Sequence, residues 1–305
     1  MTTKTARIPA KSRKPAIEWR DRYLGANGLR FHYQEWGSSK APPMLLLHGF
    51  SQDGHSWDEF ARALQGEYHI VALDQRGHGD SSWAPDHDYG AGAMIKDLEH
   101  VVKGLGWHTT PFVLCGMSMG GRNSMLLAAK HPKWVSRLVI VDVGPEIMQK
   151  GAENIRRFVQ GADVLTFDEF VQQAMKFNPR RPEANIRERL GFRLKRLRNG
   201  KYTWKIDPVL RDPNAPRPRL GRRRDLWKVV AKIVCPTLVV RGGVSDVFAK
   251  ETGQKMAQVM ANARFATVPK AGHSVMGDNP AGFEKAVRRF LKTVKVGGAS
   301  RRPGS

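Results

Sequence analysis

The stretch Gly116-Met117-Ser118-Met119-Gly120-Gly121 decides the fold of this chain. It follows the apolar run 111–115 and precedes the helix-like segment 122–130. A strand, a tight turn and a helix form the context in which Gly-x-Ser-x-Gly has chemical meaning. Gly116 and Gly120 fit such a turn because a Cβ at either position would strike the neighbouring strand or helix. The turn lifts the Ser118 hydroxyl above the sheet edge, next to the N–H groups that open the helix. Ser118 is therefore a candidate nucleophile.

The serine motif arises often by chance in a chain with 30 glycines, so its partners decide its meaning. A serine hydroxyl needs a base within hydrogen-bond reach, and histidine titrates in the right range. Among the ten histidines, His273 follows the strand-like run 263–268 and the turn at Gly272. It thus occupies a loop at the carboxyl end of a strand, where ligands and catalysis collect in open α/β sheets. We predict that His273 is the base.

A carboxylate should orient this imidazole, and Asp246 is the predicted one. Asp246 lies in the loop that leaves the strand-like run 236–241. The chain order Ser118, Asp246, His273 is the order expected for this architecture. Asp142, at the end of the apolar run 138–141, is the competing candidate. The alternative role for Asp246 is a helix N-cap, and strand-end aspartates such as Asp142 often bond only to local backbone.

An oxyanion hole is expected beside the serine. The apolar run 44–47 ends in His48-Gly49-Phe50, and Gly49 allows the backbone to approach a substrate closely. The backbone N–H groups of Phe50 and Met119 are the predicted donors, with His48, Gly49, Gly116 and Gly120 in supporting roles. The simpler interpretation of this run is a strand-to-loop turn marked by glycine.

These motifs together resemble the α/β-hydrolase family, in its serine-nucleophile branch. The resemblance extends from about Arg20 to Val296 and includes five ordered motifs. They are His48 to Phe50, Asp74 to Ser81, the serine turn, Arg241 to Asp246, and Gly272-His273. The family implies that the loop from Asp74 to Ser81 supports the site, so His78 is expected to be structural.

The predicted fold is a mostly parallel central sheet flanked by helices, with a helical cap inserted after the strand that ends near Asp142. Residues 20–144 and 234–296 form the predicted core, and residues 145–233 the cap. Residues 1–19 are expected to be a disordered basic leader, and residues 297–305 a disordered tail. Strands are predicted at 31–36, 44–47, 69–73, 112–115, 138–141, 237–240 and 264–268. Core helices are predicted at 57–64, 93–105, 119–130, 250–260 and 281–294.

The predicted cap contains helix-like patches at 153–160, 167–177 and 183–197, followed by a proline-rich run. In the family such a cap covers the nucleophile and shapes the substrate pocket. Five of its aromatic residues could line that pocket, although aromatics at helical spacing are more often core: Phe158, Phe170, Phe177, Phe192 and Trp204.

Composition limits the other function classes. No Cys/His cluster has metal-ligand spacing and no glycine-rich phosphate fingerprint is present, so neither a metal nor a cofactor is expected. Cys115 and Cys235 adjoin apolar runs and are expected to be buried thiols in a cytoplasmic protein. No apolar run reaches 18 residues, so no transmembrane segment is expected.

The formal net charge of +23 is not explained by the fold. Residues 150–228 contain 21 Lys and Arg against 9 Asp and Glu, with the densest patch at Arg222 to Arg224. The ordinary interpretation is an arginine-rich surface. A basic cap could instead steer an anionic small-molecule substrate to the site, whereas a nucleic acid or an anionic surface is the less favoured partner.

The predicted reaction is hydrolysis of a carboxylic ester, lactone or thioester through an acyl-enzyme. Ser118 excludes the branches of this fold that form an alkyl ester on an aspartate. The turn at Ser118 to Arg122 also resembles that of menaquinone-pathway synthases, which eliminate pyruvate with the same triad. Meta-cleavage C–C hydrolases and a non-catalytic binding protein on this fold are the remaining alternatives.

Overall fold

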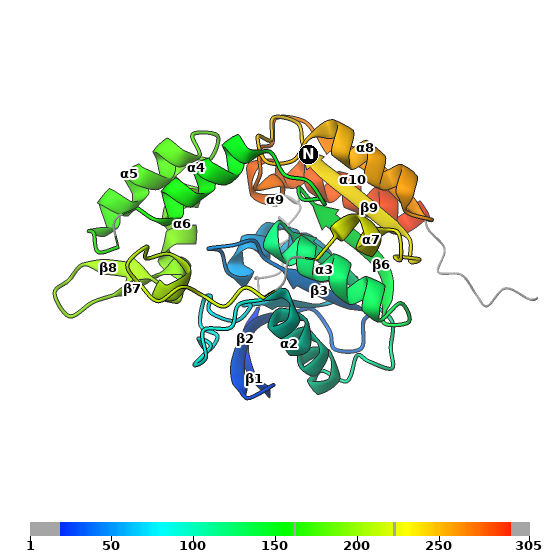
Figure 1. Ribbon diagram of the computed structural model, residues 1–305, viewed down its shortest axis with the longest axis horizontal. Coiled ribbons are helices and arrows are strands. Elements are labelled where there is room, and N and C mark those ends of the chain that lie inside the picture. The colour runs from blue at the N-terminus through cyan, green and yellow to red at the C-terminus, as the bar shows by residue number, and fades with distance from the viewer. Residues whose placement is uncertain (1–18, 162, 222–223, 294–305) are drawn as a thin grey trace, which may run out of the picture.

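An eight-stranded sheet forms the centre of the molecule in the computed structural model, which describes residues 19–161, 163–221 and 224–293 (Figure 1). The spatial order of its strands is β1-β2-β4-β3-β5-β6-β9-β10. Their bounds are β1 Arg20–Ala26, β2 Leu29–Trp36, β3 Pro43–Leu47, β4 His69–Leu73, β5 Phe112–Met117, β6 Val135–Val141, β9 Thr237–Gly242 and β10 Ala263–Val268. β1, β2 and β4 pair antiparallel, and all other neighbours pair parallel. The expected mostly parallel sheet is confirmed.

The apolar runs form strands because both faces of the sheet are covered. Every residue of β3, β4 and β5 is buried. Successive side chains alternate between faces: Leu45 and Leu47 join one apolar cluster, while Met44 and Leu46 join the other. A parallel sheet buried on both sides accounts for strands that consist of continuous apolar runs.

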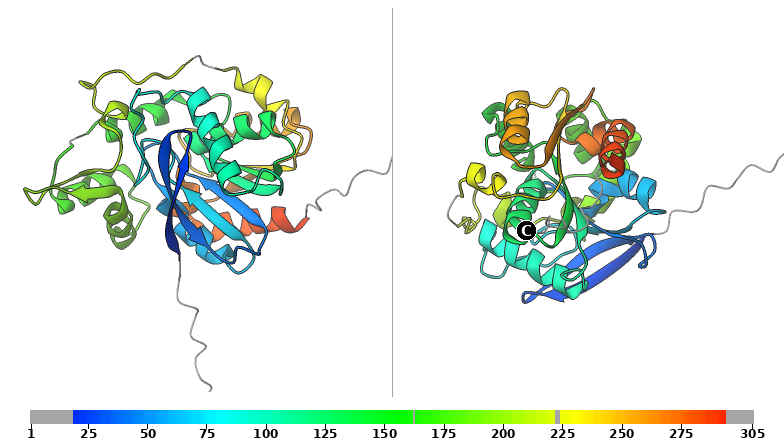
Figure 2. Two further views of the ribbon diagram at one scale, coloured as in Figure 1. Left: turned by 90° about the horizontal axis from the view of Figure 1, so that it is seen from below. Right: turned by 90° about the vertical axis from the view of Figure 1, so that its right-hand side faces the viewer.

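Helices form a layer on each face of the sheet (Figures 1 and 2). One layer contains α2 Ala91–Gly104, α3 Met119–Lys130, α7 Leu226–Val230 and α8 Lys250–Val259. The other contains η1 Gly54–Trp57, α1 Asp58–Leu64, α9 Val275–Asp278 and α10 Pro280–Thr293. The ends of the parallel strands that carry the functional loops therefore lie between two fixed layers.

Strand β1 has no counterpart among the predicted strands. Its burial is uneven, with four exposed residues in succession, so it lacks the apolar run that marks the inner strands. It is held at the sheet edge by antiparallel pairing with β2. Trp19, assigned in the sequence to the leader, packs against Trp36 with ring centroids 5.5 Å apart. The rest of that leader and the predicted tail 297–305 lie outside the described residues.

The segment between β6 and β9 lies to one side of the sheet in Figure 1. It contains α4 Gln149–Val159, α5 Phe167–Phe177, α6 Glu183–Arg193, β7 Leu194–Arg196, β8 Tyr202–Trp204 and η2 Pro208–Leu210. These elements have their own apolar cluster, which includes Phe170, Leu190 and Trp204. α7 at the end of the segment packs against the core cluster instead, through Val230.

The helix predicted at 183–197 is too long. It ends at Arg193, and the chain turns into the β7–β8 hairpin, where Leu194 pairs with Trp204. The apolar residues at 194 and 197 fit a helix and a strand equally well over so short a stretch. Burial of Leu194 and Trp204 in the cap cluster selects the hairpin.

Two further sequence expectations concern the cysteines and the membrane. Cys115 and Cys235 are both buried free thiols, as expected. Among the described residues, no helix is both long and apolar enough to cross a lipid bilayer.

The backbone is tightly packed at the turn between β5 and α3. A Cβ on Gly120 would lie 2.2 Å from the Leu47 carbonyl oxygen, and one on Gly116 would lie 2.3 Å from the Gly120 carbonyl oxygen. Contacts this short are incompatible with any side chain. The two glycines therefore let α3 begin directly against the end of β3.

We predict that Gly120→Ala destabilises the protein by about 1–3 kcal/mol or more, because backbone atoms must move to accept the methyl group. Gly92→Ala is the matched control. No atom lies within 4 Å of its added Cβ, in the first turn of α2, so this change is expected to be neutral or to stabilise by up to about 1 kcal/mol. Urea unfolding of both variants measures the difference. Equal free energies of unfolding for the two variants would contradict the steric explanation.

Candidate active site

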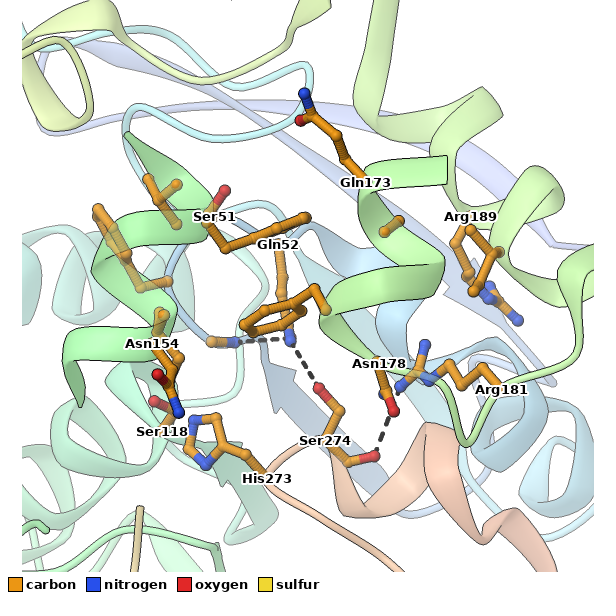
Figure 3. Close-up of a pocket in the computed structure, with 18 of the residues that line it drawn as sticks. Ser51, Gln52, Ser118, Asn154, Gln173, Asn178, Arg181, Arg189, His273 and Ser274 are labelled. Atoms are coloured by element: carbon orange, nitrogen blue, oxygen red, sulfur yellow. Dashed lines mark hydrogen bonds between the residues drawn. The ribbon is translucent and has the colours of Figure 1, made fainter. Parts of the chain in front are cut away.

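Ser118 occupies the sharp turn between β5 and α3. Its backbone has φ 53° and ψ −115°, outside the regions that non-glycine residues prefer. Its N–H donates to the Val141 carbonyl oxygen at 3.0 Å, which ties the turn to the neighbouring strand β6. A strained serine held on a strand-to-helix turn has its hydroxyl presented above the sheet, and Ser118 lines the cavity there (Figure 3).

His273 lines the same cavity, and Figure 3 draws it next to Ser118. Its Nδ1 lies 2.8 Å from Oδ2 of Asp142, a carboxylate with no solvent exposure. Asp142 also accepts hydrogen bonds from the Gly242 N–H at 2.8 Å and from the Ser245 hydroxyl at 2.5 Å. A carboxylate with this many donors holds the Nδ1–H tautomer of the imidazole, which leaves Nε2 available as a base.

The structure corrects the predicted acid, because Asp246 is not the hydrogen-bond partner of His273. Asp246 Oδ2 instead accepts from Nδ2 of Asn154 in α4, at 3.1 Å. Arg241 holds the loop that carries Asp246. Its guanidinium donates to the carbonyl oxygens of Gly243, Ser245 and Phe248, and so fixes the loop with Asp246 turned toward the cap.

Chain order could not separate the two aspartates, since both lie between Ser118 and His273. Spatial order separates them, because β6 is the direct neighbour of β5 in the sheet. Asp142 directly follows the last residue of β6. Its φ of 52° is a left-handed backbone conformation, which ends the extended strand. The signal available in the sequence was the position of Asp142 directly after a buried strand next to the serine strand.

The loop His48-Gly49-Phe50 is held by the His48 ring. The Gln75 N–H donates to His48 Nε2 at 3.0 Å, so that nitrogen carries no proton. His48 Nδ1–H therefore donates to the Gly49 carbonyl oxygen, at 2.7 Å. In a trans peptide the next N–H points opposite to that carbonyl, so the Phe50 N–H is directed away from the His48 ring.

This loop lies directly beside the serine. A Cβ on Gly49 would be 3.3 Å from the Cβ of Ser118 and 2.5 Å from the sulfur of Met117. The Gly120 N–H donates to the His48 carbonyl oxygen at 3.1 Å, which joins the loop to the start of α3. Met119 begins α3, so its N–H has no acceptor within the helix. The N–H groups of Phe50 and Met119 thus belong to two segments that meet at Ser118.

Two side-chain links join the His273 loop to the rest of the site (Figure 3). Gln52 accepts from the Gly49 N–H at 3.2 Å and donates to the Ser274 hydroxyl at 3.3 Å. Asp278, which has no solvent exposure, accepts from the Gly272 N–H at 2.9 Å and from the cap residues Asn178 and Arg181 at 2.7 and 3.0 Å. The position of His273 therefore depends on both the core and the cap.

The site opens into a cavity of about 700 Å³ between the core and the cap. Of the five cap aromatics considered in the sequence, Phe158, Phe177 and Trp204 line it. The other two do not. Phe170 is buried in the cap cluster, and Phe192 stacks on His55 with ring centroids 3.6 Å apart.

One group of side chains among the described residues could hold a metal ion, and it lies outside the cavity lining. The potential ligand atoms of His32, Asp74 and Asp80 lie within 4.8 Å of one another. His32 Nδ1 is already hydrogen-bonded to Asp74 at 2.7 Å, and the Asp80 N–H donates to the same carboxylate at 2.9 Å. Burial opposes protonation of His32, but the hydrogen bond and charge of Asp74 outweigh it and raise the His32 pKa. These interactions account for the group as a structural network in the loop after β4.

The sequence profile of the alpha/beta hydrolase fold matches residues 42–280. An esterase from Mycobacterium tuberculosis is 31% identical over 85% of each chain. A solved structure of that esterase superposes with a TM-score of 0.76, at 28% identity, over 92% of this chain and 93% of that one. A mouse sn-1-specific diacylglycerol lipase is 30% identical over 84% of this chain and 82% of its own. A putative 2-succinyl-6-hydroxy-2,4-cyclohexadiene-1-carboxylate synthase from Bacillus subtilis is 27% identical over 88% of this chain and 97% of its own.

The two aspartates can be distinguished by isosteric substitution. We predict that Asp142→Asn lowers kcat/KM for an ester substrate by about 10³–10⁴-fold, because the imidazole loses the carboxylate that sets its tautomer. Asp246→Asn is the matched control and is expected to cost less than about tenfold, since its carboxylate bonds Asn154 instead. Steady-state kinetics on both variants, with circular dichroism to verify folding, makes the comparison. A larger loss in Asp246→Asn would return the role of the acid to that residue.

Burial makes the folded protein acid-sensitive at two imidazoles. It lowers the pKa of His48 to about 3, with added repulsion from His78, and lowers the pKa of His78 to about 4. Below pH 6.5 the unfolded chain binds protons at these rings and the folded chain does not. The free energy of unfolding should therefore fall as the pH falls from 6.5 toward 4, by about 1.4 kcal/mol per pH unit for each ring.

Urea unfolding at pH 7, 6 and 5 tests this expectation on the wild type and His78→Gln. The variant should show a shallower pH dependence, by about one ring's contribution. Identical slopes for the two proteins would contradict the assignment of His78 as a buried neutral imidazole.

Proposed function

The chain belongs to the α/β-hydrolase family and is a hydrolase of that fold, and we propose that it cleaves a carboxylic ester, lactone or thioester of a small molecule through an acyl-enzyme on Ser118. The observation that carries this proposal is the strained turn at Ser118, which lines one cavity with a histidine hydrogen-bonded to a buried aspartate. Ser118 also separates this chain from enzymes of the fold that form an alkyl ester on an aspartate nucleophile.

The proposed acylation begins with transfer of the Ser118 hydroxyl proton to Nε2 of His273. The serine oxygen bonds to the substrate carbonyl carbon and gives a tetrahedral oxyanion. Asp142 stabilises the imidazolium through Nδ1. The bond to the leaving oxygen or sulfur then breaks, and His273 returns the proton to it. Water attacks the acyl-enzyme with His273 as base, which releases the acid and restores the Ser118 hydroxyl.

The oxyanion would be held by the N–H groups of Phe50 and Met119. His48 supports this role because its hydrogen bond to the Gly49 carbonyl oxygen orients the following N–H. Gly49, Gly116 and Gly120 support it by allowing the three backbone segments to meet at Ser118. Donors fixed before the reaction lower the barrier without reorganisation, and removing one typically costs on the order of 10²–10³ in rate.

Residues 145–233 would act as the cap that shapes the substrate site over a core of residues 20–144 and 234–296. The side chains of Phe158, Phe177 and Trp204 would form its apolar wall. Six basic but only two acidic residues line the cavity, which supports a small-molecule substrate that carries negative charge.

The second candidate reaction is an elimination in which the same triad abstracts a proton. It is favoured by the similarity to the Bacillus subtilis synthase, whose length this chain covers almost completely. C–C bond hydrolysis is a related reaction that the same triad would catalyse. In both reactions Ser118 need not form an ester with the substrate. The third candidate is a binding protein without catalysis, and the presence of Ser118, His273 and Asp142 together argues against it.

Labelling with a fluorophosphonate probe tests the nucleophile. Wild-type protein should be labelled once, and Ser118→Ala should abolish both the labelling and the hydrolysis of 4-nitrophenyl esters, with a loss of about 10⁴-fold or more in kcat/KM. Parallel incubation with the synthase's substrate separates ester hydrolysis from elimination. Folded wild-type protein that neither reacts with the probe nor hydrolyses an ester would contradict the proposed function.

A further inference from the structure

The cavity has two chemically different ends (Figure 3). Ser118, His273 and Asn154 lie together at one end. Arg181 and Arg189 lie at the opposite side of the view, beyond Ser274 and Asn178, and all of these residues line the same cavity. A ligand that fills the cavity from end to end would meet the nucleophile at one end and guanidinium groups at the other.

Three cap arginines that line the cavity lie close enough for their charges to interact: Arg181, Arg189 and Arg193. Arg189 and Arg193 are four residues apart on α6 and therefore share a helix face. Burial lowers the pKa of Arg193. The negative charge of Asp53 opposes this shift, and the positive charges of Arg181 and Arg189 add to it. Three guanidinium groups this close need negative charge around them.

Arg189 obtains that charge from the protein. Its guanidinium lies 2.5 Å from Asp58 and 2.8 Å from Glu59, and it also donates to the His55 carbonyl oxygen. Its side chain is only 5% exposed. Arg189 is therefore a structural anchor between α6 and the segment at 55–59.

Arg193 has fewer hydrogen-bond and ion-pair partners than Arg189. It donates from Nη2 to the Ser56 hydroxyl at 2.8 Å, while its buried Nε has no hydrogen-bond partner among the described residues. The nearest carboxylate is Asp53, at 3.7 Å from Nε, which is beyond hydrogen-bond distance. As a whole, the Arg193 side chain is 18% exposed and lines the cavity. An arginine at a cavity wall with this few hydrogen bonds to the protein is uncommon.

Asp53 lies at ion-pair distance from Arg193 but makes no hydrogen bond to it. Both of its carboxylate oxygens are buried without a hydrogen bond among the described residues, and burial raises its pKa, which weakens it as a counter-ion. Arg181 also keeps donors beyond its bonds to Asp278 and to the Ser274 carbonyl oxygen, because a guanidinium has five N–H groups. Arg181 and Arg193 both line the cavity, and their side chains are 13% and 18% exposed, so part of each side chain is accessible to a ligand there.

We propose that Arg193 and Arg181 form a subsite for a free carboxylate of the substrate, at the end of the cavity remote from Ser118. The planar fork of an arginine matches the two oxygens of a carboxylate. The substrate class is then an ester or thioester of a dicarboxylic acid, with the scissile carbonyl at Ser118 and the second carboxylate at the arginines. This assignment rests on the proposed ester hydrolysis and specifies its substrate.

The test compares 4-nitrophenyl hydrogen adipate with 4-nitrophenyl hexanoate, which has a methyl group in place of the carboxylate. Wild-type protein should hydrolyse the adipate ester with a kcat/KM at least about tenfold higher, a ratio that added NaCl should reduce. Arg193→Gln should lower that ratio about tenfold. Arg193→Lys, which keeps the charge but loses the fork, should fall between the two.

Arg187→Gln on the same helix is the matched control. Its guanidinium is bonded to Glu183 and Asp168 on the cap surface, so both rates and their ratio should stay at wild-type values. Hexanoate hydrolysis by each variant reports whether the site is still assembled. The hemiglutarate and hemipimelate esters define the spacing between the two ends.

A second measurement does not depend on turnover. Free adipate should raise the melting temperature of wild-type protein and of Ser118→Ala, but not of Arg193→Gln. Inorganic phosphate at the same concentration should have a smaller effect.

The outcomes separate the two proposals. Hexanoate hydrolysis without a preference for adipate, or an equal preference in Arg193→Gln, would overturn the carboxylate subsite and leave ester hydrolysis standing. Stabilisation by phosphate but not by adipate would also overturn it. Hydrolysis of neither ester would contradict the proposed function, and adipate stabilisation that requires Arg193 would still support the subsite.

Discussion

Backbone crowding at the β5–α3 turn is the constraint on which the site depends. Gly116 and Gly120 allow strand β5, helix α3 and the end of β3 to approach within distances that no Cβ permits. Ser118 adopts its positive φ at the centre of this contact. The cost of that conformation is met by the surrounding packing, since β3 and β5 are buried along their whole length. The proposed nucleophile is fixed in this way and needs no rearrangement to face a substrate.

Buried polar groups extend this rigidity to the loops around the serine. Asp142 joins the ends of β6 and β9 to His273, His48 orients the loop after β3, and Asp278 joins the His273 loop to the cap. Each group is buried with several hydrogen bonds, the condition under which polar networks specify one geometry. The incompletely bonded Arg193 departs from this pattern, and it faces the cavity.

The inner strands and the serine turn could be predicted because a single local signal specifies each of them. Continuous apolar runs mark β3 to β6, and the spacing of Gly116, Ser118 and Gly120 marks the turn. Features that depend on tertiary partners could not be predicted. Chain order allowed Asp142 and Asp246 equally, and the tertiary hydrogen bonds of Asp142 to His273 and of Asp246 to Asn154 distinguish them. In the same way, β1 depends on pairing with β2, and the end of α6 depends on burial of Leu194.

Covalent catalysis by Ser118 is the central claim, and rapid-quench mass spectrometry tests it most directly. Protein mixed with 4-nitrophenyl hexanoate and acid-quenched within milliseconds should gain the mass of one hexanoyl group, located on the peptide that contains Ser118. The adduct should disappear as hydrolysis is completed. Turnover of the ester with no adduct on that peptide, or with an adduct on another residue, would contradict the account.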